Sequence, residues 1–312
     1  MSTTLTAEVS DELTRGLNLV RRHAGLPDGE AHLMRFTINA VYRIGDSVVR
    51  LARGEAALRR AATVVAGTAL LHQYHVPSIE LDSYISQPIA VEDWVATVWR
   101  YQPHPPGRPE PVDLAAPLTA LHAIIEFPTF LPRWSPVANA RRRLARTLTL
   151  PAKELAATRI WSALQVGMPL DDLIAHLQAR ADDLERKLPA TRWDLAPGVI
   201  HGDAHVGNLL ADRLCDFDSL AIGPREWDLV PLAHGVTRFS DALALYEQFV
   251  AAYNYDLRTA QAWPLLREIR DLQLTTSVLD NLAGRPEVAN TLARRLRTYL
   301  DGNASAAWAR YR

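Results

Sequence analysis

Lysine is almost absent from this chain, cysteine occurs once, and the charges nearly cancel. Only Lys153 and Lys187 are lysines among the 34 basic residues, so a phosphate bound by the first half of the chain would have to meet arginine or peptide N–H groups. The single cysteine, Cys215, excludes an intrachain disulfide and is typical of a reducing compartment. A formal net charge of −1 and a pI of about 6.8 do not favour binding to nucleic acid or to a membrane surface.

Long apolar segments are missing as well. No apolar run reaches the roughly 18 residues that a membrane-spanning helix needs, and residues 1–10 lack the basic start and apolar core of a signal peptide. With 312 residues, 48% of them hydrophobic, the chain can form two parts that each have a buried core. We therefore expect a cytoplasmic protein that binds neither membrane nor nucleic acid, and its oligomeric state stays open.

The periodic segments predict strands in the first part of the chain and helices in the second. Two strand-like runs at 41–44 and 47–51 flank Gly45-Asp46 and predict a hairpin. The proline-rich block at 103–111 cannot form regular structure and predicts a boundary. The remaining expected elements before this block are a helix at 11–24 capped by Ser10, a helix at 55–75 that Pro77 ends, and strands at 79–81, 84–85 and 95–101.

After the boundary, apolar residues recur every three or four positions, which favours helices. These helices are expected at 114–125, 139–147, 155–164, 170–188, 227–236, 240–254, 265–282 and 286–300, with short strands between 198 and 218. The fold class is therefore α+β in two lobes, a small β-rich lobe over residues 1–102 and a larger, mostly helical lobe over residues 103–312.

The most informative stretch follows the apolar pair Val199-Ile200. It contains Asp203, then Asn208 five residues later, and Asp216 on the next expected strand. Asp203 can accept the proton of an attacking hydroxyl, while Asn208 and Asp216 offer the oxygen ligands that a hard cation such as Mg²⁺ prefers. This arrangement of one base and two metal ligands favours a kinase.

These motifs resemble the aminoglycoside phosphotransferase and choline kinase superfamily, which has the protein-kinase-like fold. The likeness is carried by residues 201–208 (HGDAHVGN), 216–218 (DFD) and 223–229 (GPREWDL). It implies a nucleotide-binding first lobe and a second lobe that holds the catalytic and acceptor-binding residues. It further implies Asp203 as catalytic base, Asn208 and Asp216 as magnesium ligands, and His201 and Asp228 as supports of the catalytic loop.

The same resemblance implies a site for ATP or GTP with Mg²⁺. Arg50 stands where the family has a basic residue on the α- and β-phosphates, and the base would lie against the linker near Trp99 and Tyr101. The loop at 35–40 has no glycine, so Thr37 and Asn39 are the expected phosphate contacts there. The helix glutamate that normally holds the basic residue is missing, so either Glu55 reaches Arg50 or this ion pair is absent.

Several residues keep two interpretations. Asp218 could contact a second metal or cap a turn, and His205 could contact phosphate or acceptor or serve only as a hydrogen-bonded structural histidine. An acidic series later in the chain could hold an amine-bearing acceptor, or it could pair with the interleaved Arg267 and Arg270 on a charged surface. The members of this series are Glu268, Asp271 and Asp280.

The sequence therefore predicts a small-molecule kinase that acts on a hydroxyl acceptor, such as an aminoglycoside-like antibiotic, an amino sugar or a related metabolite. Antibiotic resistance is the role suggested by family analogy alone. One alternative is a pseudokinase-like module that binds nucleotide with weak or no transfer, because the helix glutamate is missing. Another is a metallohydrolase with a His/Asp cluster made by His201, Asp203, His205, Asp216 and Asp218.

Overall fold

The structure is a computed structural model that describes residues 6–26, 29–36, 39–103 and 107–311. It contains two compact units, Met1–Pro132 with Gly198–Gly223, and Arg133–Pro197 with Pro224–Arg312. The first unit carries the main sheet and the second is helical, which confirms the α+β fold class. The units part at residue 132, so the lobe boundary expected at residue 102 stays a prediction.

A five-stranded antiparallel sheet in the order β1-β2-β3-β5-β4 forms the centre of the first unit. The predicted hairpin is confirmed by β2 (Ala40–Ile44) and β3 (Ser47–Arg53), which pair Val41 with Arg50. The other strands are β1 (Ala31–Phe36), β4 (Ile89–Val91) and β5 (Trp94–Arg100). The edge strand β1 was not predicted, because its largely exposed side chains do not alternate between apolar and polar.

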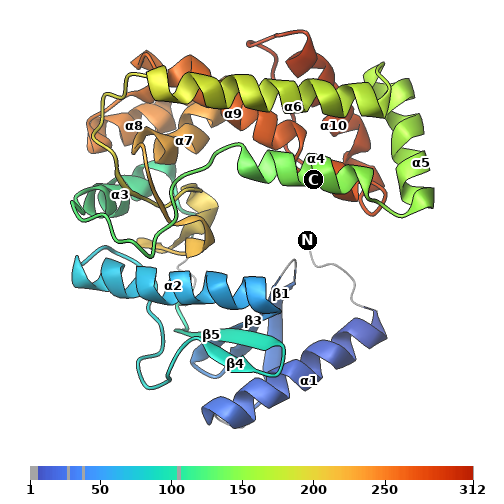
Figure 1. The fold of residues 1–312 in the computed structure, drawn as a ribbon. Helices are drawn as coiled ribbons and strands as arrows, with labels where there is room; N and C mark the ends of the chain where they lie inside the picture. Colours follow the sequence, from blue (N-terminus) through green and yellow to red (C-terminus); the bar gives the residue numbers. More distant parts are fainter. Residues whose placement is uncertain (1–5, 27–28, 37–38, 104–106, 312) are drawn as a thin grey trace. The chain divides into compact units, whose positions relative to one another are not determined.

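Helices α1 (Ala7–Ala24) and α2 (Glu55–Gln73) lie on opposite faces of this sheet (Figure 1). On the α1 face, Leu17 and Val20 pack into one buried core with Val49 and Val98 of the sheet. Arg50 lies between Val49 and Leu51 on β3, so its side chain points to the opposite face. The expected Ser10 cap of α1 is wrong, since the helix begins one turn earlier, at Ala7, and its N-cap is Thr6, whose hydroxyl accepts from the Val9 amide (3.4 Å).

The chain returns to the first unit after residue 197. There β6 (Gly198–Ile200) pairs with β9 (Ala221–Gly223), and β7 (Leu209–Leu210) pairs with β8 (Arg213–Leu214). Helix α3 (Ala115–His122) packs on β6. The strands expected at 79–81 and 84–85 are wrong. Only isolated bridges form near the first, and the carboxylate of Asp82 caps a turn at the second by accepting from the Tyr84 amide (2.9 Å).

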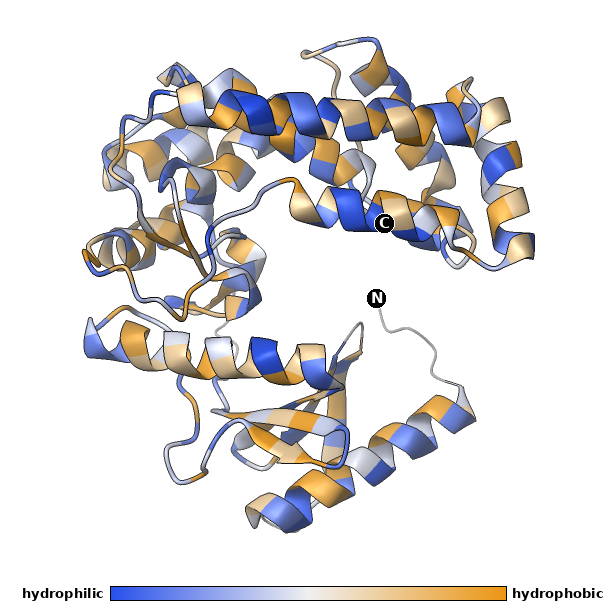
Figure 2. Ribbon diagram, viewed as in Figure 1, coloured by the Kyte–Doolittle hydropathy of each residue, from blue (hydrophilic) through white to orange (hydrophobic). Residues whose placement is uncertain are grey.

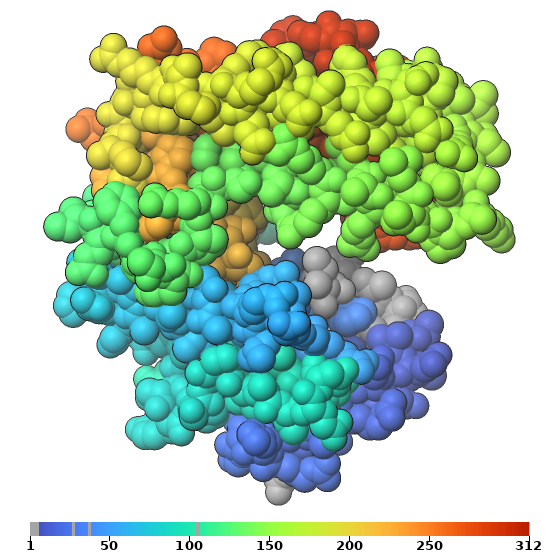
Figure 3. Space-filling view, in the orientation of Figure 1, coloured from blue at the N-terminus to red at the C-terminus, as the bar shows by residue number. Residues whose placement is uncertain are grey.

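The second unit is built around α9 (Trp263–Thr275), whose Leu266, Ile269 and Leu272 are buried. It packs against α6 (Leu170–Lys187), α7 (Glu226–Phe239) and α10 (Ala289–Leu300), as Figure 1 shows. One side of α6 is exposed along its length (Figure 3), and its polar residues lie there (Figure 2). The remaining helices are α4 (Ala138–Leu148), α5 (Ala152–Trp161) and α8 (Leu243–Tyr253).

The helix expected at 265–282 ends early, at Thr275. The hydroxyls of Thr275, Thr276 and Ser277 all donate to carbonyls three or four residues before them, which competes with the helical pattern. A separate 3₁₀ turn, Leu279–Asn281, follows. Within the described parts of the chain, no helix combines the length and the apolar character needed to cross a membrane.

The backbone of Gly202, in the loop after β6, lies very close to the backbone of Ser219, in the turn before β9. Gly202 has a φ of +83°, and a Cβ placed on it would overlap the carbonyl oxygen of Ser219. No L-residue with a side chain can therefore occupy this position without moving the backbone. The loop after β6 and the turn before β9 depend on this contact.

We expect Gly202→Ala to destabilise the protein far more than Gly25→Ala. Gly25 also has a positive φ (+63°), but no atom of the described residues lies within 4 Å of its would-be Cβ. The control change should therefore cost only the left-handed strain of about 1–2 kcal/mol, whereas Gly202→Ala adds a backbone overlap of about 1–3 kcal/mol or more. Thermal melts measure both, and equal losses in midpoint would show that the approach to Ser219 is unimportant.

Candidate functional site

The hairpin formed by β7 and β8 brings together residues that lie on either side of it. Leu209 pairs with Leu214, and the Cys215 amide extends the ladder by donating to the Asn208 carbonyl (2.9 Å). Asn208 and Asp216 therefore both lie at the open end of the hairpin, one on each strand side. The Asn208 side-chain amide donates to the main-chain carbonyl of Asp203 (2.9 Å), which joins the loop after β6 to this end.

Asp203 has an accessible carboxylate beside a histidine. Its side chain is 41% exposed, and its Oδ2 lies 3.7 Å from Nε2 of His205. The other ring nitrogen of His205 accepts from the Gly207 amide (3.0 Å), which fixes the orientation of the imidazole. A carboxylate placed in this way can accept a proton from a bound hydroxyl group.

His201 is fully buried beneath this loop, and both of its ring nitrogens have partners. Its Nε2 lies 2.9 Å from the Cys215 carbonyl, which can only accept, so Nε2 carries the proton. Nδ1 then accepts from the Asp203 amide (3.4 Å). An imidazole used in this way cannot also ligate a metal, and it holds the loop instead. Asp228, the other expected support, is fully buried on α7 in the second unit.

Arg50 is held by two acidic side chains and one amide. Its guanidinium donates to both carboxylate oxygens of Asp218, one at 2.9 Å, and its Nη1 lies 3.7 Å from Oδ1 of Asp216. With its amide oxygen turned towards Arg50, Asn39 accepts from Nε (3.1 Å) and Nη2 (2.6 Å). Arg50, Asn39, Asp216 and Asp218, all singled out in the sequence, therefore lie together.

The partner of Arg50 is Asp218, and not Glu55, which was the one partner that the sequence suggested. Glu55 binds Arg59 one turn along α2, and its side chain is 82% exposed. The ion pair is nevertheless present, because Asp218 supplies the carboxylate in place of the missing helix glutamate. Sequence analysis missed this contact because Arg50 and Asp218 are 168 positions apart.

A pocket of about 400 Å³ opens beside this cluster, entirely within the first unit. Arg50, Asn39 and Asp216 line its polar end, and the predicted Trp99 and Tyr101 line it as well. Its apolar walls come from Met34, Val41, Val48, Ile79, Leu210 and Phe217. Sequence analysis did not single out these apolar residues, because their types and spacing are those of any core. Thr37, the other expected nucleotide contact, lies outside the described residues.

The linker residues have geometry that limits how they could meet a ligand. The Tyr101 amide donates to the Asp46 carbonyl (2.8 Å), and the Arg43 guanidinium stacks on the Tyr101 ring at 3.6 Å. The Trp99 indole N–H donates to the Thr97 hydroxyl (2.9 Å). Both side chains are thus fixed as walls of the pocket. Cys215 also lines the pocket, and burial raises the pKa of its thiol to about 12, so it remains neutral and unreactive.

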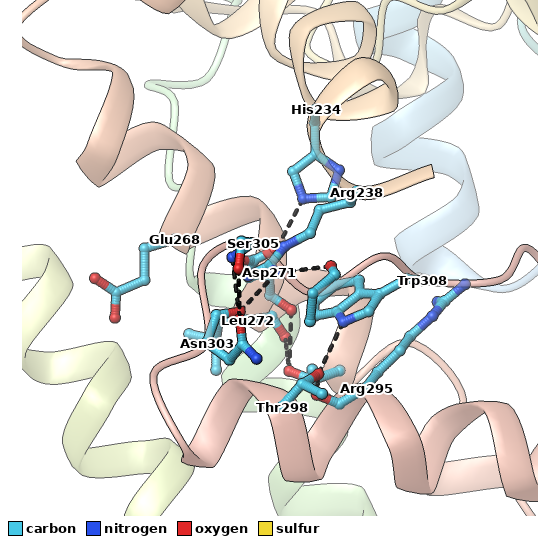
Figure 4. Close-up of polar contacts among 12 residues, drawn as sticks. His234, Arg238, Glu268, Asp271, Leu272, Arg295, Thr298, Asn303, Ser305 and Trp308 are labelled. Carbon is cyan, nitrogen blue, oxygen red and sulfur yellow. Dashed lines mark hydrogen bonds and ion pairs between the residues drawn. The ribbon is translucent and has the colours of Figure 1, made fainter. Parts of the chain in front are cut away.

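The acidic series of the second unit is already paired with arginines. Asp271 is only 2% exposed and accepts from Nε2 of His234 (2.8 Å) and Nε of Arg238 (3.0 Å), both of which point at it in Figure 4. Glu268 points away from this cluster and binds Arg180. Asp280 lies 3.5 Å from Arg146. These partners come from other helices, α4, α6 and α7, whereas the sequence analysis had considered the neighbouring Arg267 and Arg270.

Comparison with known families gives a match over most of the chain. The model of the phosphotransferase enzyme family matches residues 37–269. A search of the curated proteins finds no match.

Solved structures share the fold. An AMP-bound spectinomycin phosphotransferase has a TM-score of 0.60 at 14% identity, with 91% of this chain and 97% of that chain covered. A choline/ethanolamine kinase family protein from Mesorhizobium loti has a TM-score of 0.55 at 18% identity, with 94% of each chain covered.

An aminoglycoside phosphotransferase from Streptomyces rimosus, solved with ADP and streptomycin, has a TM-score of 0.55 at 17% identity and covers 83% of this chain and 98% of that chain. At such identities the likeness establishes the fold alone, and the family match adds the activity class. The resemblance seen in the sequence is thereby confirmed: the chain belongs to the phosphotransferase enzyme family, and it is a small-molecule phosphotransferase.

Proposed function

We propose that this enzyme transfers the γ-phosphate of ATP or GTP, bound with Mg²⁺, to a hydroxyl group of a small molecule. The observation that supports this most is the position of Arg50, which Asp218 and Asn39 hold beside Asp216 at the polar end of an apolar pocket. Neighbours of similar fold were solved with AMP and with ADP, which agrees with a nucleotide in this pocket.

In this proposal the base lies between the apolar walls and the phosphates point to Arg50. Val41 and Val48 on the sheet side and Leu210 and Phe217 on the other offer the surfaces between which a planar ring can be buried. Guanidinium groups bind phosphate with two parallel hydrogen bonds. N–H groups of Arg50 that donate to Asp218 can therefore donate to a nucleotide phosphate instead. The chain thus needs no lysine here.

The residues expected to bind magnesium fit such an ion. The nitrogen of the Asn208 amide is committed to the Asp203 carbonyl, which leaves its oxygen as the ligating atom, and the Asp216 carboxylate is 42% exposed. In the described part of the chain no group of three or more His, Cys, Asp or Glu could hold a metal by itself. Mg²⁺ commonly takes one or two protein oxygens and completes its shell with phosphate and water. When bound, it would neutralise charge on the phosphates.

Asp203 is the proposed base for the acceptor hydroxyl. The neighbours include a spectinomycin phosphotransferase, an enzyme solved with streptomycin, and a choline/ethanolamine kinase family protein. A hydroxyl compound of amino-sugar or amino-alcohol type is therefore the acceptor class that we propose. We do not assign an acceptor amine to Glu268, Asp271 or Asp280, because each of these carboxylates already binds an arginine.

The two alternative functions lose their main support. The weakly active nucleotide-binding module rested on a missing ion pair, and Arg50 has that pair with Asp218. The metallohydrolase needed His201 as a ligand, and both nitrogens of that ring already have partners, the Cys215 carbonyl and the Asp203 amide.

We expect Asp203→Asn to reduce phosphate transfer by about 10²–10⁴-fold, the usual contribution of a general base, without weakening nucleotide binding. The readout is ADP release in the presence of an acceptor, with nucleotide affinity measured separately by calorimetry. Asp212→Asn, the same substitution in the exposed turn between β7 and β8, is the control and should leave turnover unchanged. Undiminished turnover in Asp203→Asn would contradict the assigned role.

Asp218 should act through Arg50, and a double-mutant cycle measures this. Asp218→Asn removes a charged hydrogen-bond pair worth about 1.5–3 kcal/mol, so we expect kcat/KM for ATP to fall roughly 10–100-fold. Arg50→Gln should cost at least as much, and the double variant no more than Arg50→Gln alone. Glu55→Gln should have no effect, since Glu55 binds Arg59.

If Asp218 instead served as an independent metal ligand, the two losses would multiply. The apparent affinity for Mg²⁺ would then also fall in Asp218→Asn while it stayed unchanged in Arg50→Gln.

A further inference from the structure

A second pocket lies wholly inside the helical unit. It has a volume of about 330 Å³, and its walls come from α6, α7, α9, α10 and the segment after α10. The side chains that matter for its chemistry are Arg180, Arg238, Arg267, Glu268, Asp271 and Tyr299. No residue of the nucleotide pocket belongs to it, so it is a separate place on the molecule.

The acidic groups of this pocket are neutralised from within. Glu268 is bound by Arg180, and Asp271 is bound by Arg238 through Nε and Nη2 (3.0 and 2.5 Å) and by His234. Figure 4 shows Arg238 and His234 converging on Asp271. Of the three arginines that line the pocket, Arg238 is paired with Asp271, and Arg180 is shared between Glu268 and Asp183 (2.9 Å), which lies outside the pocket. Arg267 is the lining arginine that has no carboxylate partner among the described residues, so it carries the positive charge that is not neutralised.

Arg267 and Tyr299 each carry a donor proton that has no acceptor among the described residues, while the oxygen of Tyr299 interacts with Arg180. The Nε of Arg267 is buried, and the Tyr299 hydroxyl is buried as well. Among the described residues, no group accepts the proton of either. Burial raises the pKa of the Tyr299 hydroxyl, so it stays a proton donor. Leaving buried donors unpaired costs about 1–3 kcal/mol each, so such groups in native proteins usually meet a partner.

The wall opposite the helices is held in place. Nη1 of Arg238 donates to the carbonyls of Asn303 (2.8 Å) and Ala306 (3.0 Å). The Trp308 indole donates to the Thr298 hydroxyl (2.9 Å), a contact drawn in Figure 4. The segment that carries Gly302 and Ala304 into the pocket is therefore fixed before any ligand arrives.

We propose that this pocket binds a small acidic molecule, whose carboxylate or phosphate group accepts hydrogen bonds from Arg267 and Tyr299. The positive charge of Arg267 favours an anion, and Arg267 and Tyr299 are lining residues that each carry a donor without a partner among the described residues. The same charge disfavours an amine, the ligand that the acidic sequence pattern had suggested for this region. The site stands independently of the proposed phosphate transfer, because it shares no residue with that site.

The test measures the thermal midpoint during titration with inorganic phosphate or with acetate, against sodium chloride at equal ionic strength. All proteins carry Arg50→Gln, so that an anion at the nucleotide site does not contribute. Onto this background we place Arg267→Gln, Tyr299→Phe and the control Arg270→Gln, which removes an arginine from the same helix but not from this pocket. Phosphate also stabilises proteins by exclusion from their surface, but that effect is equal in all variants.

We expect a saturable rise of several degrees in the background protein and in Arg270→Gln, and its loss in Arg267→Gln and Tyr299→Phe. A rise with phosphate alone identifies a site for phosphate groups, and a rise with both anions identifies a site that accepts carboxylate and phosphate groups alike. Equal responses of Arg267→Gln and Arg270→Gln to both anions, including no response in either, would overturn the proposal. Turnover of Arg267→Gln, measured in the otherwise native chain, separates this outcome from any failure of the proposed phosphate transfer.

Discussion

The ion pair between Arg50 and Asp218 is the contact on which the nucleotide site depends. It joins the central strand of the sheet to the turn after β8. Asn39 and Asp216 lie beside the same guanidinium, so the polar end of the pocket is built around Arg50. A lysine could not do this, because its ammonium lacks the planar fork that meets a carboxylate with two parallel hydrogen bonds. Arginine in place of lysine at position 50 is therefore what allows the distant Asp218 to hold this side chain with two hydrogen bonds. The carboxylate that a helix would supply comes instead from the strand end that also supplies the proposed metal ligand.

Local sequence signals predicted the local parts of this arrangement. The Gly45-Asp46 turn, the apolar periods of the helices and the spacing of Asp203, Asn208 and Asp216 all correspond to elements of the structure, because each depends on neighbours within a few residues. The pairing of Arg50 with Asp218 could not be found in this way, since its members are far apart in the chain. The edge strand β1 was missed because pairing with β2, not burial of its side chains, holds it in the sheet. The early end of α9 depends on hydroxyl groups whose bonds to the backbone no periodicity reveals.

The sequence and the structure favour ligands of opposite charge for the region around α9. The series Glu268, Asp271 and Asp280 suggests an acidic surface for an amine, yet folding buries Asp271 and matches every member with an arginine from another element. A buried carboxylate is tolerated only when it is paired and hydrogen-bonded, and Asp271 meets both conditions through Arg238 and His234. Once these pairs have formed, Arg267 is the arginine lining this pocket that has no carboxylate partner among the described residues. The net preference of the pocket is thereby the reverse of what the residue types alone indicate.

The central claim is that the first unit binds a magnesium–nucleotide complex through Arg50 and the residues around it. The most direct measurement is a thermal melt of the unaltered protein titrated with ATP, with and without Mg²⁺. A ligand at about 100 times its Kd stabilises a protein by roughly 2.7 kcal/mol, which raises the midpoint of a protein of this size by several degrees. The account predicts such a rise when ATP and Mg²⁺ are both present, and a much smaller one with ATP alone. A midpoint that does not move at millimolar MgATP, or that moves equally without Mg²⁺, would contradict it.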